Sequence, residues 1–398
     1  MLLSLQYVFV AAASKPLPPH WVATWATANW QADNARTQIA HTDTTLREIV
    51  HTTLGGSLVR VELSNEFGTE PLQVGAVHLA LAGSKDAILL SSANALTFDG
   101  KSSVTIAPGA VALSDPAALS AKPASDVAIS IFLPAQTLTQ LSRHGDAFTT
   151  SYMADGDQAG RISLRNPKQI SSWYFLKSVQ VKAPGKDGAI VAFGDSITDG
   201  TGSTPNAHNR WVDVLAQRLQ KDKRTSGLAL VNEGIGGNRV LNEGAGPSAL
   251  TRFNRDALSI AGVRYVILLE SINDIGRLKD QAHPGQNISA DQLTQAITHL
   301  IDQAHAKGVK VILATLTPYA GANYDSPEGE QIRKQVNAWI RTNPSSDGVV
   351  DLAAATRDPS DTTHWKQADQ AGDQLHPSPA GHSAMANAFD LKLFSARR

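Results

Sequence analysis

The sequence contains no cysteine. Thiol nucleophiles, disulfide bonds and thiolate metal ligands are therefore excluded together, and the fold depends on packing alone. An excess of charge of one sign is also lacking, since 35 Lys and Arg residues face 36 Asp and Glu residues. No Lys/Arg-rich run gives the basic surface that is typical of nucleic-acid binding, so we expect no nucleic-acid partner.

Long hydrophobic runs are absent as well. The apolar N-terminal stretch, residues 2–13, is too short to span a bilayer. It ends in Ala11, Ala12 and Ala13, which resemble a small-residue cleavage site, although no basic residues precede it. We therefore interpret residues 1–15 as a possible signal-peptide remnant. The sequence predicts a secreted protein, extracellular or periplasmic, with no integral membrane segment.

The first large region, residues 20–182, has the pattern of short strands. Residues 57–63 alternate Val59, Val61 and Leu63 with polar side chains, which is the period of a half-buried strand. Clusters of Gly, Pro, Asn and Ser separate such runs, and no long helical period intervenes. This pattern predicts an N-terminal antiparallel β-sandwich domain, jelly-roll-like in its connections.

After a turn-forming connector, residues 183–188, the pattern changes to alternating strands and helices. The strands are almost continuously apolar, which suits a parallel sheet that is covered on both faces. Ser289 and Gln292 form a capping-box signature, and Gly308 marks the end of that helix. We expect an α/β domain over residues 188–396, with a parallel sheet between two helical layers. Its expected strands are residues 189–193, 228–231, 265–269, 309–315 and 348–352.

The first of these strands runs into Gly194, Asp195 and Ser196. Open α/β sheets bind their ligands at the carboxyl ends of the strands, so Ser196 is a candidate nucleophile. A serine hydroxyl needs a base to take its proton and a third group to orient that base. Asp373 and His376, three residues apart, provide such a pair if the carboxylate holds Nδ1–H and leaves Nε2 free.

Acyl transfer also requires donors for the developing oxyanion. The loop after the second strand is rich in glycine, which lets the Gly237 N–H approach a substrate closely. Asn273 follows the third strand and offers a carboxamide. The predicted oxyanion hole therefore consists of the Ser196 and Gly237 amides and the Asn273 side chain. Asn238 and Arg239 lie in the same loops and are candidate substrate-binding residues.

The segments Gly194-Asp195-Ser196, Gly237-Asn238, Asn273-Asp274 and Asp373-x-x-His376 resemble the four blocks of the SGNH, or GDSL-type, hydrolase superfamily. Its members are esterases, lipases and carbohydrate deacylases on a flavodoxin-like α/β/α fold without a metal. The resemblance, over about residues 188–395, implies that Ser196 is the nucleophile, His376 the base and Asp373 its orienting group. It implies no cofactor. The whole chain is also similar to secreted members with an extra N-terminal β-domain.

One position departs from this family pattern. Ser271 stands where glycine is usual, two residues before Asn273. A side chain there would strain the loop if the backbone φ were positive, or would narrow the pocket.

The sequence thus predicts a serine ester hydrolase that acts through an acyl-enzyme, on short acyl esters or acylated carbohydrates. A lipase for longer acyl chains remains an alternative, although no long apolar lid is evident. A glycan-binding surface protein with a pseudoenzyme domain is a second alternative. A Gly-x-Ser-x-Gly elbow is excluded by Thr198, and Gly234 to Arg239 lacks the last glycine of a dinucleotide-binding motif. No histidine shows metal-ligand spacing, so no metal site is expected.

Overall fold

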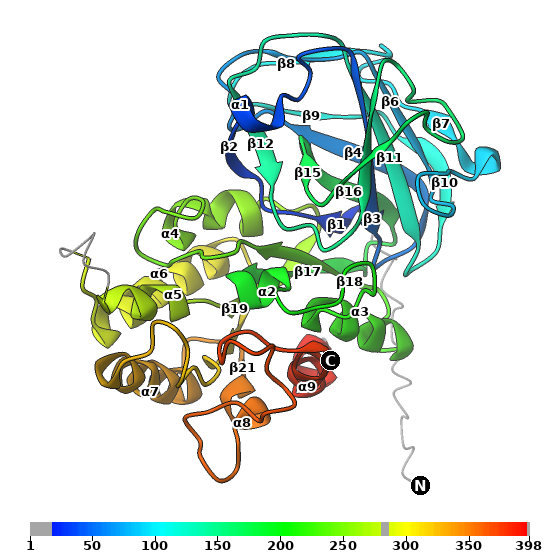
Figure 1. Ribbon diagram of the computed structural model, residues 1–398. Coiled ribbons are helices and arrows are strands. Elements are labelled where there is room, and N and C mark those ends of the chain that lie inside the picture. The colour runs from blue at the N-terminus through cyan, green and yellow to red at the C-terminus, as the bar shows by residue number, and fades with distance from the viewer. Residues whose placement is uncertain (1–17, 280–285, 396–398) are drawn as a thin grey trace, which may run out of the picture.

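The structure, a computed structural model, describes residues 18–279 and 286–395. Antiparallel sheets come first along the chain, and a parallel sheet with helices follows (Figure 1). The predicted signal-peptide remnant, residues 1–15, lies outside the described residues. Within the described residues, no helix combines the length and the hydropathy that a bilayer crossing demands.

The N-terminal half is built from antiparallel strands, as predicted. In β4 (Gly56–Ser64), Val59, Val61 and Leu63 are buried, so the alternation seen in the sequence does mark the core face. The jelly-roll order of these strands stays a prediction. One sheet has the order β1 (His20–Ala26), β16 (Leu176–Ala183), β4 and β10 (Ala117–Ala121), with β9 (Val111–Leu113) beside β4. A second has the order β14 (Lys168–Ile170), β13 (Ser151–Asp155), β3 (Thr44–His51), β11 (Asp126–Leu133), β6 (Ala76–Leu81) and β7 (Asn94–Ala95). Two smaller sheets join β15 (Trp173–Tyr174), β12 (Gln140–His144) and β2 (Trp30–Asp33), and β5 (Leu72–Val74) with β8 (Val104–Ile106).

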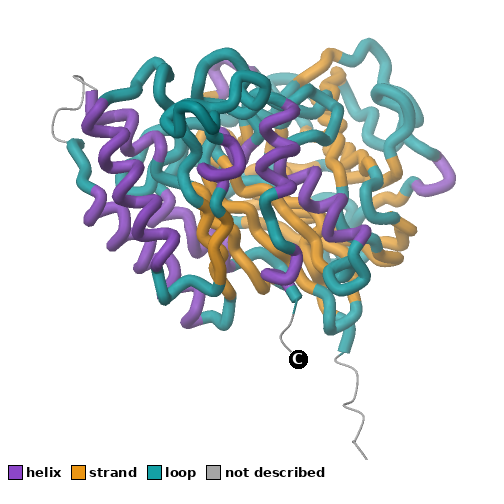
Figure 2. The backbone as a smooth tube through the Cα atoms, turned by 90° about the horizontal axis from the view of Figure 1, so that it is seen from below, coloured by secondary structure: helices purple, strands orange, loops and turns teal. Residues whose placement is uncertain are grey.

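The C-terminal half contains the predicted parallel sheet. Its strands are β17 (Gly188–Gly194), β18 (Leu228–Gly234), β19 (Val263–Leu269), β20 (Lys310–Ala314) and β21 (Gly348–Val350). Their spatial order, β18-β17-β19-β20-β21, is the 2-1-3-4-5 order of flavodoxin-like folds. All seven residues of β17 are buried, because helices lie on both sides of these strands (Figure 2).

The helices of this half begin and end at recognisable capping residues. In α6 (Ala290–Ala306), the predicted capping box is present, since Ser289 and Gln292 bond each other's backbone N–H. Pro379 opens α9 (Pro379–Asn387), where its missing N–H costs nothing. The other helices of this half are α2 (Ser196–Asp199), α3 (Trp211–Lys221), α4 (Ala249–Phe253) continued by the π-helical η2 (Asn254–Leu258), α5 (Ile272–Gly276), α7 (Pro327–Thr342) and α8 (Leu352–Thr356), with 3-10 turns η3 (Arg277–Lys279) and η4 (Leu391–Phe394). The N-terminal half adds α1 (Asn34–Thr37) and η1 (Leu90–Ser92).

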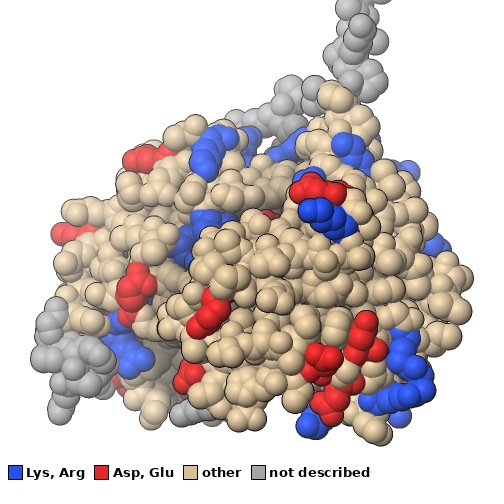
Figure 3. Space-filling view, turned by 90° about the horizontal axis from the view of Figure 1, so that it is seen from above, with Lys and Arg blue, Asp and Glu red and all other residues tan. Residues whose placement is uncertain are grey.

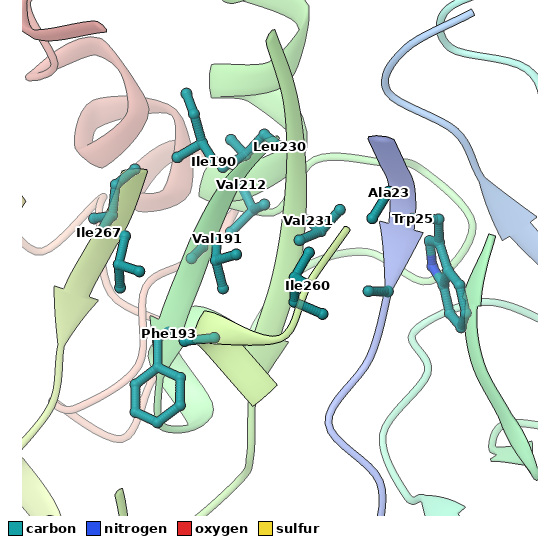
Figure 4. Packing of buried hydrophobic residues seen from close by; sticks show 14 of the residues in the cluster. Ala23, Trp25, Ile190, Val191, Phe193, Val212, Leu230, Val231, Ile260 and Ile267 are labelled. Atoms are coloured by element: carbon teal, nitrogen blue, oxygen red, sulfur yellow. The ribbon is translucent and has the colours of Figure 1, made fainter. Parts of the chain in front are cut away.

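The two halves pack closely along the edge of the parallel sheet. Ala23 from β1 lies between Trp25 and the pair Val231 and Ile260 in one apolar cluster (Figure 4). The edge strand β18 also donates the Leu230 N–H to Thr53 Oγ1, at 3.1 Å. The antiparallel half thus covers an edge that would otherwise expose unpaired backbone groups. We propose that residues 184–187, between β16 and β17, connect two domains, 20–182 and 188–396.

Candidate active site

Ser196 lies at the turn that follows the carboxyl end of β17. Asp195 caps the short helix α2, since its Oδ1 accepts the Ile197 N–H at 2.8 Å. Ser196 is the first residue of that helix and is only 8% exposed. The turn requires Gly194, because a Cβ there would lie 2.2 Å from the Leu269 carbonyl oxygen. The predicted strand-end serine is therefore fixed by the local backbone.

The structure brings Ser196 together with His376 and Asp373. The Ser196 Oγ lies 2.8 Å from His376 Nε2, although the two residues are 180 positions apart. His376 Nδ1 lies 2.5 Å from Asp373 Oδ2. Partial burial opposes ionisation of Asp373, but hydrogen bonds from the His376 backbone and ring and from the Leu375 N–H lower its pKa. An ionised carboxylate thus orients the imidazole, in the geometry of a Ser-His-Asp triad.

The predicted oxyanion donors come from three successive strand ends. The Ser196 N–H is the first amide of α2, so no carbonyl of that helix can accept from it. Gly237 has a φ of 76°, a left-handed conformation that glycine adopts without strain. Asn273 Nδ2 donates to the Asn238 carbonyl at 2.9 Å, and Tyr324 lies with its OH 3.2 Å from Asn273 Oδ1. These two contacts fix the carboxamide orientation and leave one Nδ2 hydrogen for a substrate.

Tyr324 was not predicted, because no motif in the sequence marks it. Burial raises the pKa of its phenol, so the group stays a hydrogen-bond donor at neutral pH. Gly276 at the end of α5 makes room for it, since a Cβ there would lie 2.4 Å from the Tyr324 ring. Gly276 indicates from the sequence that something packs closely there, but it does not indicate that the Tyr324 side chain is the group in contact.

Arg252 was also not predicted, and its side chain joins two of the strand-end loops by hydrogen bonds. It is fully buried. Its guanidinium donates to the Gly194 carbonyl at 2.9 Å, to the Glu233 carbonyl at 2.8 Å and to Asn238 Oδ1 at 2.8 Å. It also stacks over the Phe193 ring, 3.9 Å from the centroid. One side chain thus holds the nucleophile turn and the Gly237 loop in a fixed relation.

Two buried carboxyl groups lie beneath the site. Burial raises the pKa of Asp195 to about 7, even though the Ile197 N–H stabilises its ionised form. Burial also raises the pKa of Glu270, whose Oε2 accepts the Ser271 N–H at 2.8 Å. These groups belong to the scaffold of the loops, because both side chains are almost completely covered.

The N-terminal half contacts α2 directly through His144 of β12. His144 Nε2 lies 3.1 Å from Asp199 Oδ1, and its Nδ1 lies 2.9 Å from the Ala28 carbonyl. Burial opposes a charge on this ring, but the Asp199 carboxylate outweighs burial and raises the pKa of His144. Both ring nitrogens face acceptors, which favours the imidazolium. Burial also raises the pKa of Asp199, so the contact is a buried hydrogen-bonded pair. This pair joins the two halves and supports the helix that carries Ser196.

Asn238 and Arg239, the candidate substrate-binding residues, have partners inside the chain. Asn238 Nδ2 donates to the carbonyls of Ala245, at 2.9 Å, and Pro247, at 2.8 Å. Arg239 Nη1 donates to Gln286 Oε1 at 2.6 Å. Both residues are less than 10% exposed. These hydrogen bonds hold both side chains within the loop. Contact of Asn238 or Arg239 with a substrate stays a prediction.

Ser271 occupies a backbone conformation that favours glycine. Its φ is 111°, and its side chain is fully buried. Its Oγ has no hydrogen-bond partner among the described residues. Of the two outcomes expected from the sequence, backbone strain is therefore the one that applies. Because the Ser271 side chain is fully buried, it does not narrow an open pocket.

The Ser271→Gly variant should be more stable than the native chain. Relief of the backbone strain and loss of the unpaired hydroxyl should outweigh the extra freedom of glycine in the unfolded chain, with a net gain of about 1 kcal/mol in the free energy of unfolding. Thermal and urea unfolding measure this gain. Ser271→Ala is the matched control, because it removes the hydroxyl but keeps the strained Cβ. A glycine variant no more stable than the native chain would contradict the assignment of strain.

The comparisons with known proteins concern mainly the C-terminal half of the chain. Residues 192–384 match the sequence model of the GDSL-like lipase/acylhydrolase family. A curated acetylxylan esterase from Geobacillus stearothermophilus is 26% identical over 213 residues, 50% of this chain and 91% of that enzyme. A solved variant of an acetyl xylan esterase from Geobacillus stearothermophilus is 25% identical, with coverage of 54% of this chain and 99% of that one and a TM-score of 0.40. An alpha/beta hydrolase enzyme from the metagenome of Lake Arreo, Spain, is 23% identical, with coverage of 52% and 94% and a TM-score of 0.40.

The family match and the curated relative identify this chain as a carboxylic ester hydrolase of the serine esterase and acylhydrolase class. Through residues 192–384 it belongs to the SGNH/GDSL esterase superfamily, as its four motifs predicted. The pseudoenzyme alternative is therefore set aside.

Proposed function

We propose that the chain hydrolyses short acyl esters, or acyl groups on carbohydrates, through an acyl-enzyme on Ser196. The observation that carries the proposal is the continuous chain of hydrogen bonds from Ser196 Oγ through His376 to Asp373. Such a chain lets the imidazole take the serine proton as the hydroxyl attacks.

The reaction proceeds in two halves. Ser196 Oγ attacks the ester carbonyl carbon while His376 Nε2 takes the hydroxyl proton. The amides of Ser196 and Gly237 and the free Nδ2 hydrogen of Asn273 stabilise the oxyanion. When the intermediate collapses, the leaving alcohol takes the proton from His376 and the acyl group stays on Ser196. Water then attacks the acyl carbon while His376 takes its proton, and His376 returns that proton to Ser196 Oγ as the carboxylic acid leaves.

The substrate class rests on the relatives and on the sequence. The curated relative is an acetylxylan esterase. This similarity supports small acyl groups on a polysaccharide as the substrate of this chain. The sequence shows no long apolar segment of the kind that covers a lipase site. On the one face drawn in Figure 3, acidic and basic side chains are intermixed. A secreted location, extracellular or periplasmic, is part of the proposal and rests on residues 2–13.

A panel of substrates tests this proposal. The purified chain is assayed with p-nitrophenyl acetate, butyrate, octanoate and palmitate, and with acetylated xylan, where released acetate is measured. We expect the highest kcat/KM for acetate among the aryl esters, together with release of acetate from the glycan. A rise in kcat/KM toward palmitate would favour the lipase alternative. No hydrolysis of any substrate would contradict the proposed function as a whole.

A further inference from the structure

His51, Asp126 and His208 form a cluster outside the active site. His51 ends β3 and Asp126 begins β11, and the two are directly paired across these antiparallel strands. His208 comes from the loop between α2 and α3. We propose that these three side chains bind a zinc ion that joins the N-terminal sheet to this loop.

The donor atoms of the cluster lie at distances that suit one small ion. Asp126 Oδ1 lies 2.7 Å from His51 Nδ1 and 3.2 Å from His208 Nε2. A ligand atom from each residue lies within 4.8 Å of the other two. Tetrahedral zinc with bonds of about 2.0–2.2 Å separates its donors by about 3.3–3.6 Å, so the 2.7 Å contact between Asp126 and His51 must lengthen to admit the ion.

The chemistry of the donors selects the kind of metal. Two imidazole nitrogens and one carboxylate oxygen are ligands that zinc and similar transition ions prefer. Calcium and magnesium prefer oxygen ligands throughout, so a set with two nitrogens disfavours both. Asp213 is the nearby carboxylate on α3, and Arg210 already holds it at 2.8 and 2.9 Å. Water would therefore complete the coordination of the ion.

The loop that carries His208 is held in place before any ion arrives. The rings of His51 and His208 stack with centroids 3.8 Å apart and planes 18° apart, and one nitrogen of each lies close to Asp126 Oδ1. Because the lone pair of an imidazole nitrogen lies in the ring plane, one ring must turn out of this stack to aim its nitrogen at the same ion. Asn206 anchors the loop, since its N–H donates to the Phe148 carbonyl at 2.9 Å and its Oδ1 accepts the Thr150 N–H at 2.7 Å. The loop that carries His208 therefore loses little backbone entropy on metal binding.

An ion can also reach the cluster. The side chains of His51 and His208 are 13% and 19% exposed, and that of Asp126 is 42% exposed. The carboxylate thus faces solvent, while the two rings form the covered side of the site. Because its ligands come from both halves of the chain, the ion would bind the folded state and stabilise the contact between them.

Titration calorimetry with Zn²⁺ tests this site on the full chain after dialysis against a chelator. We expect one equivalent to bind the native chain with a Kd of about 1 μM or below, and Zn²⁺ to raise its Tm. His51→Ala and His208→Ala should each weaken binding by at least about 100-fold and abolish the rise in Tm. Ca²⁺ and Mg²⁺ should not bind at the same concentrations.

Two controls keep the result interpretable. His305→Ala removes a histidine outside the cluster, whose Nε2 lies 2.8 Å from Asp347 Oδ2, and this variant should bind Zn²⁺ as the native chain does. Asp126→Asn keeps the size of the side chain but loses its charge, and should weaken binding even where circular dichroism shows a native fold. If the native chain binds no stoichiometric Zn²⁺, or if the three variants bind it equally well, the cluster is a pair of hydrogen bonds and the proposal is wrong. Ester hydrolysis is not the readout, so this outcome leaves the proposed function untouched.

Discussion

Replacement of Ser196 by alanine should lower kcat/KM for p-nitrophenyl acetate by about 10⁴- to 10⁶-fold, because a residual rate then comes only from binding and the oxyanion donors. The fold should persist, since the Ser196 side chain is small and its Oγ contact with His376 is only partly buried. Steady-state kinetics measures the loss, and thermal unfolding confirms the fold.

A second replacement sharpens this result. His376→Ala should cause a similar loss, and the double variant should lose little more, because the two side chains act as one unit. Ser203→Ala is the matched control, since Ser203 lies in the loop after α2 and its Oγ has no hydrogen-bond partner among the described residues. Native turnover in Ser196→Ala would mean that another group is the nucleophile.

Replacement of Asn273 by alanine should lower kcat by about 10²- to 10³-fold with little change in KM, because one donor to the oxyanion is removed. The interaction forms in the transition state, when negative charge develops on the carbonyl oxygen. Asn273→Asp is a near-isosteric variant that replaces the donor with an acceptor, and it should lose at least as much activity. The comparison of kcat with KM distinguishes this role from weaker substrate binding.

The Tyr324→Phe variant tests how much the orientation of the Asn273 carboxamide contributes to catalysis, apart from the hydrogen bond that Asn273 donates to the oxyanion. The variant keeps the ring that packs against Gly276 but loses the hydroxyl contact to Asn273 Oδ1, 3.2 Å away. We expect a kcat reduction of about 10-fold or less, since the contact of Nδ2 with the Asn238 carbonyl still holds the carboxamide. An effect on KM alone for Asn273→Ala would contradict its place in the oxyanion hole.

Much of the fold was predictable because its signals are local. The helix that begins after Ser289 has a capping box within four residues, and the structure places α6 there. The apolar runs of the C-terminal half became the strands of a parallel sheet, because an almost continuously apolar strand must be covered on both faces. The antiparallel character of the N-terminal half followed from residue alternation, of which β4 is an example.

The rest depended on contacts between residues far apart in the chain. Tyr324 and Arg252 belong to the site, but nothing in their own segments indicates which loops they contact. The strain at Ser271 was conditional on a backbone angle that only the structure supplies, 111°. His51, Asp126 and His208 lacked metal-ligand spacing because their neighbourhood is created by strand pairing and by one distant loop.

The sequence by itself determined the chemistry of the candidate groups and their positions at strand ends. A serine after an apolar strand, glycines in the next loop, an asparagine after the third strand and an aspartate three residues before a histidine are all local features. The tertiary structure decided that Ser196 Oγ lies 2.8 Å from His376 Nε2 across 180 positions. It also placed the N-terminal half against α2 through His144. The physical reason is that capping, periodicity and turns act over a few residues, whereas the proximity of distant groups depends on the packing of the whole chain.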